Sequence, residues 1–286
     1  MAPHFPEDCK VVSLVKGFHL DETNASFLRI STLISKSLKI PIEGVCSLSG
    51  PNVYQEIASN YAETNRMRRP CNAVVSSFNP STAREFQEMY FAEGILRTYY
   101  SDDIVASEVC GALKNVYAIA AGASDGHHAG NGMGINFKAS LLTRSAYELS
   151  YFVRALGGRP ENVYGLAGIG DMIATCTRGR NWEAGRRIIT GKPASQVEEE
   201  MRPNVLEGLQ TLRVVNSWLR LLRRSNPALC LELPIFEATY RFVYEGLDFE
   251  EGVEQVINRP MKKEMRMDPY VAAESEKREA GKGKNG

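Results

Sequence analysis

The sequence predicts an α/β domain followed by an all-α domain, and two patterns of apolar residues carry this prediction. Over the first hundred residues, short β-type runs alternate with segments of helical period, which is typical of a mostly parallel sheet with covering helices. After Ser101-Asp102-Asp103, apolar residues recur at intervals of three and four, the period of a helix face. We therefore expect one domain over residues 1–102 and a helical domain over 103–273.

Four strands are expected in the first domain. The run VVSLV at 11–15 is apolar apart from Ser13, as is typical of a strand covered on both faces. Helices are expected between the strands, from Asp21 to Lys39, through Ile57 and Tyr61, and from Pro80, since proline suits the first turn of a helix. The other strands are expected at VCSL (45–48), AVVSS (73–77) and ILRTYY (95–100).

The second domain shows three clear helix faces. Apolar residues repeat at helical spacing from Val109 to Ala120, from Leu142 to Leu156 and from Val205 to Leu222. Gly157-Gly158 supplies a stop for the second of these helices. The tail at 274–286 (ESEKREAGKGKNG) has no apolar residue that could anchor it, so it is expected to be disordered.

Composition excludes several classes of protein. The 34 basic and 34 acidic residues cancel, which argues against a nucleic-acid or membrane-surface partner. Six scattered cysteines include no CxxC and no Cys/His cluster at zinc spacing, so we expect no metal site and a reducing compartment. The N-terminus lacks a signal-peptide core, and no apolar run approaches membrane-spanning length. A soluble cytoplasmic protein without membrane contact is expected.

Two turns lie where an open α/β sheet binds its ligands, beyond the carboxyl ends of the strands. Lys16-Gly17 directly follows the first strand and places a cation beside an accessible backbone. Ser49-Gly50-Pro51-Asn52 follows the second strand and opens a helix, whose free N–H groups favour an anion. A solvated loop lysine and an ordinary turn are the alternatives, and both stay open.

Lys114 is an unusual residue for its surroundings. Its neighbours three and four positions away on a helix are Cys110, Gly111, Tyr117 and Ala118, so no local ion pair accounts for it. A lysine against small and apolar residues is partly desolvated, which lowers its pKa and makes it a usable proton donor or acceptor. The alternative is a lysine whose stem lies on the core while its ammonium reaches water.

The segment from Gly168 to Asn181 combines a tight turn with polar donors. Gly168-Ile169-Gly170-Asp171 precedes an apolar stretch and is compatible with a plain helix cap. In TCTRGRN (175–181), two arginines flank a glycine beside threonine and asparagine donors, which suits a phosphate or carboxylate group, although a solvated turn is the alternative. His127 and His128 lack carboxylates or cysteines at metal spacing and are interpreted as loop residues.

Nucleotide-binding glycine motifs are missing from the sequence. No GxGxxG follows a strand, since GNGMG (130–134) has the wrong spacing. The dipeptide Gly191-Lys192 is followed by proline, so it is not part of a Walker A motif.

Six segments occur in order along the chain: VVSLVKGF, LSGPNVYQEIA, SEVCGALKNVYAIAAGASDG, NFKASLLTRSAYEL, GLAGIGDMIATCTRGRN and NVLEGLQT. Together, from about Val11 to beyond Glu207, they resemble the NAD(P)-dependent glycerol-3-phosphate dehydrogenase family. The most specific parts are 108–126 and 165–181. This family interconverts sn-glycerol 3-phosphate and dihydroxyacetone phosphate by hydride exchange with a nicotinamide cofactor, so the resemblance implies a phosphorylated small-molecule substrate and NAD.

The resemblance also implies roles for individual residues. Lys114 takes the place of the catalytic lysine, which removes the C2 hydroxyl proton in oxidation and donates a proton to the carbonyl oxygen in reduction. Asp171 matches the acidic residue that arranges this lysine and the substrate hydroxyls. The substrate positions implied besides these two are Lys16, Gly50, Asn52, Thr175, Gly179, Arg180 and Asn181. The cofactor positions implied are Lys16, Tyr54, Arg180, Val205 and Glu207, although the family commonly has a small residue in place of Tyr54.

The main departure from the family lies at the front of the chain. Family members carry additional residues there, with the first strands and the glycine-rich phosphate turn of the Rossmann domain. The first domain is therefore expected to be a partial Rossmann-type parallel sheet with a free strand edge prone to aggregation, and the chain to be a fragment. The residue that chooses between NAD and NADP follows the second Rossmann strand, so NADP is not excluded.

Two other functions stay open. One is a related dehydrogenase of another hydroxy substrate, although Arg180 and Asn181 favour a phosphorylated one. The other is a catalytically silent fragment that acts only as a helical binding or dimerisation module. The resemblance implies a homodimer formed mainly through the helical domain.

Overall fold

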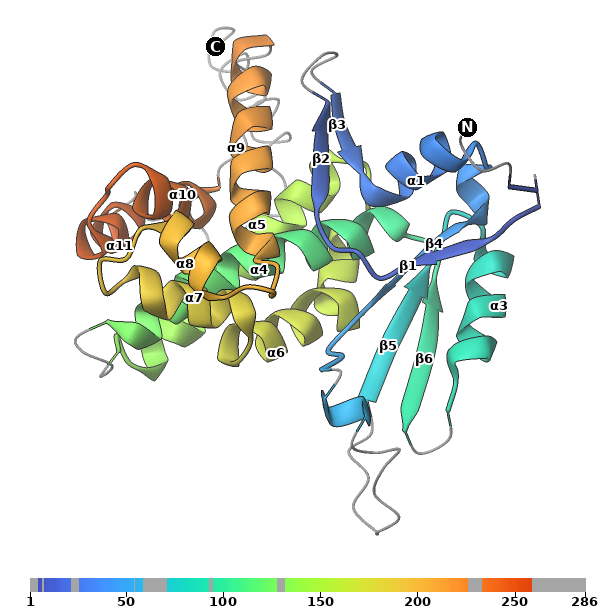
Figure 1. Ribbon diagram of the computed structural model, residues 1–286, viewed down its shortest axis with the longest axis horizontal. Helices are drawn as coiled ribbons and strands as arrows, with labels where there is room; N and C mark the ends of the chain where they lie inside the picture. Colours follow the sequence, from blue (N-terminus) through green and yellow to red (C-terminus); the bar gives the residue numbers. More distant parts are fainter. Residues whose placement is uncertain are drawn as a thin grey trace, which may run out of the picture.

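The computed structural model describes residues 5–6, 8–21, 26–53, 55–58, 71–92, 95–127, 132–225 and 233–258. A sheet-containing lobe and a helical lobe lie side by side (Figure 1). The expected order, an α/β part followed by a helical part, is confirmed. Tyr54, Tyr61, His128 and the predicted disordered tail lie outside the described residues.

The four expected strands are present and form one sheet in the order β1-β4-β5-β6. The β1–β4 and β5–β6 pairs are parallel, so the expectation of a mostly parallel sheet is confirmed, while β4 and β5 are antiparallel, with Ser47 opposite Ser76. The connection after β4 begins at Gly50, beside the carbonyl of Asn72, so β5 starts at the end of the sheet where β4 finishes and runs back alongside it. The bounds are β1 Val11–Ser13, β4 Val45–Ser49, β5 Cys71–Ser76 and β6 Leu96–Ser101.

The predicted helix from Asp21 to Lys39 is wrong in its first half. Strands β2 (Phe18–Asp21) and β3 (Ser26–Arg29) form an antiparallel hairpin, and α1 spans only Ile30–Leu38. The ring centroid of Phe27 lies 4.5 Å from that of Phe18 and 4.7 Å from that of Trp218 on α9 (Glu207–Ser225). Burial of these rings against the helical lobe outweighs the local helical pattern.

One face of the sheet is covered by α3 (Pro80–Tyr90), which begins at Pro80 as expected. Phe86 of this helix packs with Cys46 and Val75 in a small core of its own. A short 3-10 turn, η1 (Ile42–Gly44), leads into β4, and residues 55–58 are helical after it.

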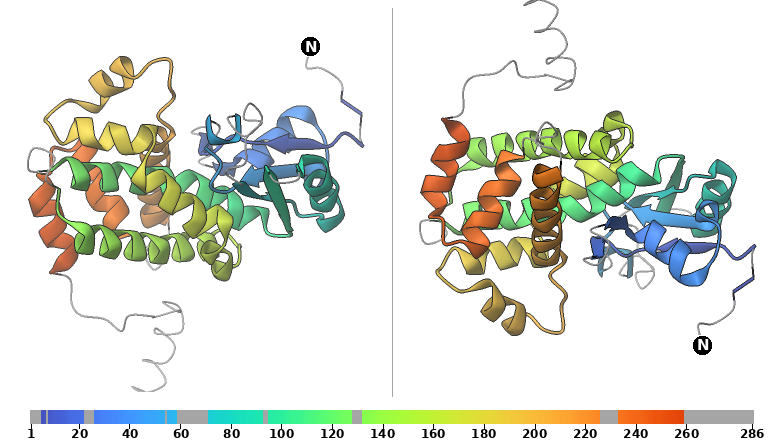
Figure 2. Two further views of the ribbon diagram at one scale, coloured as in Figure 1. Left: turned by 90° about the horizontal axis from the view of Figure 1, so that it is seen from below. Right: turned by 90° about the horizontal axis from the view of Figure 1, so that it is seen from above.

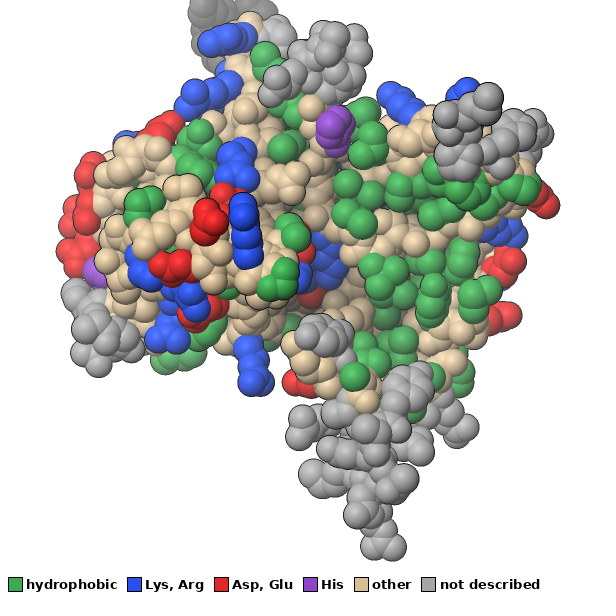
Figure 3. Space-filling view, in the orientation of Figure 1, with side chains coloured by type: hydrophobic (Ala, Val, Ile, Leu, Met, Phe, Trp, Pro, Cys, Tyr) green, Lys and Arg blue, Asp and Glu red, His purple; other side chains and the backbone are tan. Residues whose placement is uncertain are grey.

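The sheet lobe exposes apolar side chains, which gather on the face shown in Figure 3. Strand β1 lies at one edge of the described sheet, and Leu14 and Val15, which follow it, are 62% and 61% exposed. These two side chains therefore leave an apolar surface beside an edge of the described sheet.

Helix α4 (Ile104–Gly126) is the centre of the helical lobe, and every residue from Ile104 to Ser124 is buried. By length and composition it could cross a membrane, although Glu108 and Lys114 interrupt its apolar residues. Its apolar stretch of 18 residues is wholly buried inside the protein, as is typical of the core helix of a globular fold.

The helices that follow α4 in the chain pack around it, as two opposite views show (Figure 2). The predicted helix faces fall on α4, α5 and α9, each of which contributes buried residues to one continuous core. The bounds are α5 Ile135–Ala155, η3 Pro160–Tyr164, η4 Leu166–Gly170, α6 Asp171–Thr177, α7 Arg180–Ile188, α8 Ala194–Glu200, α10 Pro234–Tyr244 and α11 Phe249–Ile257.

Glycines bring α4 and α7 into backbone contact. A Cβ on Gly122 would lie 1.9 Å from the carbonyl oxygen of Trp182, and one on Gly185 would lie 2.0 Å from that of Ile119. Real Cβ atoms do not approach so closely, so only glycine permits this spacing. The contact fixes the start of α7, and with it Asn181, against the middle of α4.

Candidate active site

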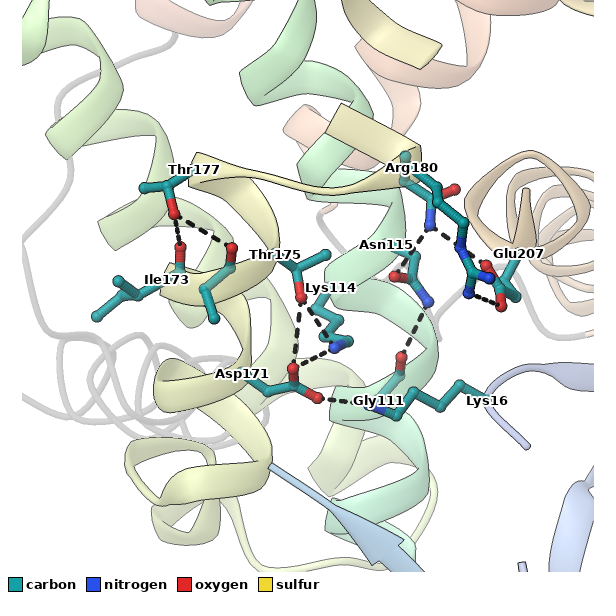
Figure 4. Close-up of polar contacts among 12 residues, drawn as sticks. Lys16, Gly111, Lys114, Asn115, Asp171, Ile173, Thr175, Thr177, Arg180 and Glu207 are labelled. Carbon is teal, nitrogen blue, oxygen red and sulfur yellow. Dashed lines mark hydrogen bonds and ion pairs between the residues drawn. The ribbon is translucent and has the colours of Figure 1, made fainter. Parts of the chain in front are cut away.

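Lys114 lies on α4 with its ammonium inside the protein, because the residue is only 4% exposed. The partner that its own helix lacks comes from α6, where Asp171 forms an ion pair with it through Oδ1. The Nζ of Lys114 also donates to Thr175 Oγ1 at 2.9 Å (Figure 4). The stem-on-core alternative, with the ammonium in water, is therefore wrong for Lys114.

Lys16 reaches the same carboxylate from the sheet lobe. Its Nζ lies 2.8 Å from Asp171 Oδ2, and its side chain is 26% exposed. Each oxygen of Asp171 thus holds one lysine, and the two lysines come from different lobes (Figure 4). Lys16 is therefore paired rather than solvated.

The surroundings of Lys114 lower the pKa of its ammonium to about 8. Burial is the largest cause, since it penalises the charged form, and the nearby charge of Lys16 acts in the same direction. The carboxylate of Asp171 opposes both effects. A lysine with this pKa can both give up and regain a proton near neutral pH.

Asp171 is placed by a π-helical turn. Residues 166–170 form the π-helical segment η4, which continues directly into α6 with Asp171 as its first residue. A Cβ on Gly168 would lie 1.9 Å from the carbonyl oxygen of Val163, so glycine is required there. π-Helical turns of this kind often occur at functional sites. The carboxylate of Asp171 points to the two lysines, so it is not a plain helix cap.

A second polar cluster lies beside the first. Arg180 Nη2 donates to Glu207 Oε1 at 2.6 Å. The amide nitrogen of Asn181 donates to Asn115 Oδ1 at 3.1 Å, while Asn181 Oδ1 accepts the backbone N–H of Gly208 at 2.9 Å. The amide of Asn181 thereby ties together the starts of α7 and α9 and the middle of α4.

Sequence reasoning missed Asn115 and Gly208. Asn115 is buried and directly follows Lys114 on α4. Its side-chain amide oxygen accepts a hydrogen bond from Asn181. A Cβ on Gly208 would lie 2.6 Å from the carbonyl oxygen of Asn115. In the sequence, the only indication was that Asn115 follows Lys114 and Gly208 follows Glu207. The contact between Asn115 and Gly208 depends on how α4 and α9 pack, which the sequence pattern does not show.

The turn after β4 lies against the helices that carry the lysine pair. Gly50 has φ +129°, and a Cβ there would lie 2.9 Å from the carbonyl oxygen of Asn72, so the turn requires glycine. A Cβ built on Gly111 of α4 would contact both Lys16 Cγ and Ser49 Oγ at 3.5 Å. The turn therefore forms a wall of the same site.

Two buried oxygens on this turn have no partner. Ser49 Oγ and Asn52 Oδ1 make no hydrogen bond among the described residues. A buried polar atom left in this way costs stability unless a ligand or water satisfies it. Asn52 was predicted as a substrate contact, whereas Ser49 was missed.

The other predicted positions are spread around these two clusters. Gly179 is exposed and begins α7 with φ +132°. Val205 is 59% exposed and lies two residues before Glu207. Tyr54 lies outside the described residues. His127 is apart from the site, since its Nε2 lies 2.9 Å from Glu250 of α11.

Comparison with known sequences decides the family. Residues 103–254 match the sequence pattern of the NAD-dependent glycerol-3-phosphate dehydrogenase C-terminus. The chain belongs to this family. A glycerol-3-phosphate dehydrogenase of Listeria monocytogenes is 35% identical over 255 residues, which cover 88% of this chain and 68% of that protein. One from Geobacillus thermodenitrificans is also 35% identical, over 83% of this chain and 64% of its own length.

Solved glycerol-3-phosphate dehydrogenase structures share the fold. The enzyme from Coxiella burnetii superposes with a TM-score of 0.69 at 27% identity, covering 87% of this chain and 69% of that one. The enzyme from Saccharomyces cerevisiae gives 0.71 at 25% identity, covering 87% of this chain and 68% of that one. This chain thus spans about two thirds of the length of these glycerol-3-phosphate dehydrogenases.

Proposed function

We propose that the chain interconverts sn-glycerol 3-phosphate and dihydroxyacetone phosphate with NAD as cofactor. The observation that carries the proposal is the buried ammonium of Lys114, held between Asp171 and Thr175 with its pKa lowered to about 8. A proton donor and acceptor of this kind is what reversible reduction of a carbonyl needs. Catalytic roles for Lys114 and Asp171 follow from it.

The substrate phosphate is assigned to the second cluster. Arg180 keeps half of its side chain exposed, and Asn181 lies next to it at the start of α7, with Gly179 before them. A guanidinium at a helix N-terminus suits a phosphate, since N–H groups and charge act together. Thr175, Lys16, Gly50 and Asn52 then face the remainder of the substrate, where Asn52 Oδ1 offers an unused acceptor to a hydroxyl.

In this mechanism Lys114 moves the proton. In reduction, the charged Nζ of Lys114 donates a proton to the developing C2 alkoxide oxygen and is later recharged from solvent. In oxidation, the neutral Nζ accepts the proton from the C2 hydroxyl. Asp171 fixes the direction of the ammonium, and Lys16 adds positive charge where negative charge develops on the oxygen.

The residues beside Arg180 fit a nicotinamide cofactor. Val205 offers an exposed apolar surface and Glu207 a carboxylate. On the turn after β4, the buried hydroxyl of Ser49 has no partner among the described residues. When bound, the cofactor supplies or takes up the hydride. We assign its contacts to Lys16, Arg180, Val205 and Glu207, and by sequence to Tyr54, without excluding NADP.

The setting of the enzyme is also proposed. A net charge of zero and the burial of α4 support a cytoplasmic protein that binds neither nucleic acid nor membrane. A homodimer through the helical lobe is proposed from the family resemblance. We also propose a division of the chain into 1–102 and 103–273, while the predicted tail at 274–286 lies outside the described residues.

Oxidation of NADH that depends on dihydroxyacetone phosphate tests the proposal. We expect Lys114→Ala to lower kcat by about 10²- to 10⁴-fold, the usual contribution of a general acid. Lys36→Ala, at an exposed lysine on α1, is the matched control and should retain activity. Equal activity of Lys114→Ala and the starting chain would exclude the assigned role.

A silent binding module is the second candidate, because the match covers only 68% and 64% of the length of the two relatives described above. Titration with NADH, followed by its fluorescence, separates the two functions. Saturable binding by the folded chain supports the enzyme. A folded chain that binds no NADH and turns over no substrate supports the module.

A further inference from the structure

A pocket of about 440 Å³ opens in the helical lobe at the end away from the sheet. Its walls are the apolar faces of α5, α10 and α11, which lie together there in both views of Figure 2. Phe137 and Leu141 line it from α5, Phe242 from α10 and Val256 from α11. Ala120 of α4 also lines the pocket, so an occupant would contact the helix that carries Lys114.

Small side chains leave this space open. Ala120, Ala238 and Gly252 face the pocket from three different helices, where larger residues would close it. Volumes of this order accept a small molecule, and a mostly apolar lining with few polar groups is typical of ligand pockets. Apolar surface without an occupant has an unfavourable contact with water, so a ligand that covers it gains affinity.

One cation contributes to the lining. Arg144 of α5 is exposed, lies with its guanidinium 4.7 Å from the ring centroid of Tyr147, and has no carboxylate partner among the described residues. The acidic residues of α11, at positions 250, 251 and 254, do not line the pocket. An occupant would therefore bring an apolar body and one anionic group.

We propose that this pocket binds a long-chain fatty carboxylate, with its acyl chain between α5, α10 and α11 and its carboxylate on Arg144. Charge complementarity selects this class of ligand. A neutral hydrocarbon would leave the guanidinium of Arg144 without an ion pair, and a small polar anion would leave the apolar walls exposed to water. The site is separate from the Lys114 cluster and does not depend on the proposed reaction.

Fluorescence titration of the full chain with cis-parinaric acid tests the proposal. We expect saturable binding to one site per chain, and displacement by saturated fatty acids that strengthens about fourfold per added methylene, the value for burying one CH₂ group. Arg144→Gln should weaken binding of the acid by about tenfold, the effect of one charge-assisted hydrogen bond, but not binding of the methyl ester. Arg202→Gln, at a distant exposed arginine, is the control.

Ala238→Phe places a ring in the pocket and should abolish binding of both probes. Circular dichroism shows whether this variant is folded. Binding that survives Ala238→Phe, or that is insensitive to Arg144→Gln, would overturn the proposal. Absence of saturable binding to the full chain would overturn it as well, and would mean that residues 259–286 or a second copy of the chain fill the pocket.

Discussion

Lys114 and Asp171 form an ion pair in which both side chains are almost wholly buried, 5% and 4% exposed. The carboxylate lies at the first residue of α6 and the ammonium in the middle of α4, so the pair also joins two helices of the core. Lys16 binds the second oxygen of the same carboxylate, so the pKa of Lys114 depends on the charges of both Lys16 and Asp171.

This coupling predicts a pH dependence of opposite sign for the two directions of the reaction. Reduction needs the charged lysine, so kcat should fall as pH rises through about 8, the pKa of Lys114. Oxidation needs the neutral lysine and should gain activity over the same range. Initial rates in both directions from pH 6 to 10 check this, and parallel profiles would contradict it.

Lys16→Met should raise the pKa of Lys114 and with it the midpoint of the pH profile. The charge of Lys16 lowers the pKa of Lys114, so its removal raises the pH at which reduction is half-lost. The rate will also fall, since a contact to the reacting oxygen is lost, but the midpoint separates the electrostatic effect from the contact. A midpoint that stays in place would show that burial alone sets the pKa.

Arg180→Lys should raise the KM for dihydroxyacetone phosphate by roughly tenfold while lowering kcat less. Lysine keeps the charge but loses the planar fork that binds Glu207 and, in the proposed site, the substrate phosphate as well. Arg178→Lys, two residues away on the same exposed turn, is the matched control. Steady-state kinetics distinguish the two, and equal values of KM would remove the phosphate from this cluster.

Glu148→Leu should destabilise the fold by about 3 kcal/mol, because it leaves several buried donors unpaired. Glu148 is buried and accepts the backbone N–H groups of Ile235 and Phe236, at 2.6 and 3.1 Å, and the hydroxyl of Tyr117 at 3.2 Å. Urea unfolding measures the loss. Glu199→Leu, at an exposed site on α8, should change stability little.

The same residue predicts how stability varies with pH. Burial raises the pKa of Glu148 to about 8, above its value in the unfolded chain. The folded state therefore binds the extra proton, and this contribution to stability is complete below about pH 4.5 and lost as pH rises to about 8. Urea midpoints from pH 5 to 8 should fall more steeply for the starting chain than for Glu148→Leu.

Gly122→Ala should be strongly destabilising although alanine favours helices. The added methyl would meet the Trp182 carbonyl at 1.9 Å, and α4 and α7 would have to separate. Overpacking of this kind costs about 1–3 kcal/mol or more. The added methyl of Gly252→Ala on α11 would approach the side chain of Leu247 at 3.3 Å and that of Ala238 at 3.9 Å and no backbone, so its thermal midpoint should be unchanged or higher.

Periodicity was sufficient to predict the helical lobe and the four strands, because continuous apolar runs and helix faces are local patterns. It failed at Phe27, whose place in a hairpin depends on Trp218, nearly two hundred positions away. Lys114 stood out as a lysine without a local partner, but nothing local shows that Asp171 supplies one. Asn115 and Gly208 were missed for the same reason, since their contacts join different helices.

The glycine contact between α4 and α7 and the bridge from Lys16 to Asp171 respond differently to ionic strength. Carbon and oxygen in van der Waals contact are indifferent to dissolved ions, so Gly122 and Gly185 hold the helices at the same spacing in any salt. The bridge between the lobes is partly open to solvent, and at about 1 M salt the screening length is only about 3 Å. Concentrated salt therefore weakens the bridge, while the ring contact between Phe27 and Trp218 still holds the lobes together.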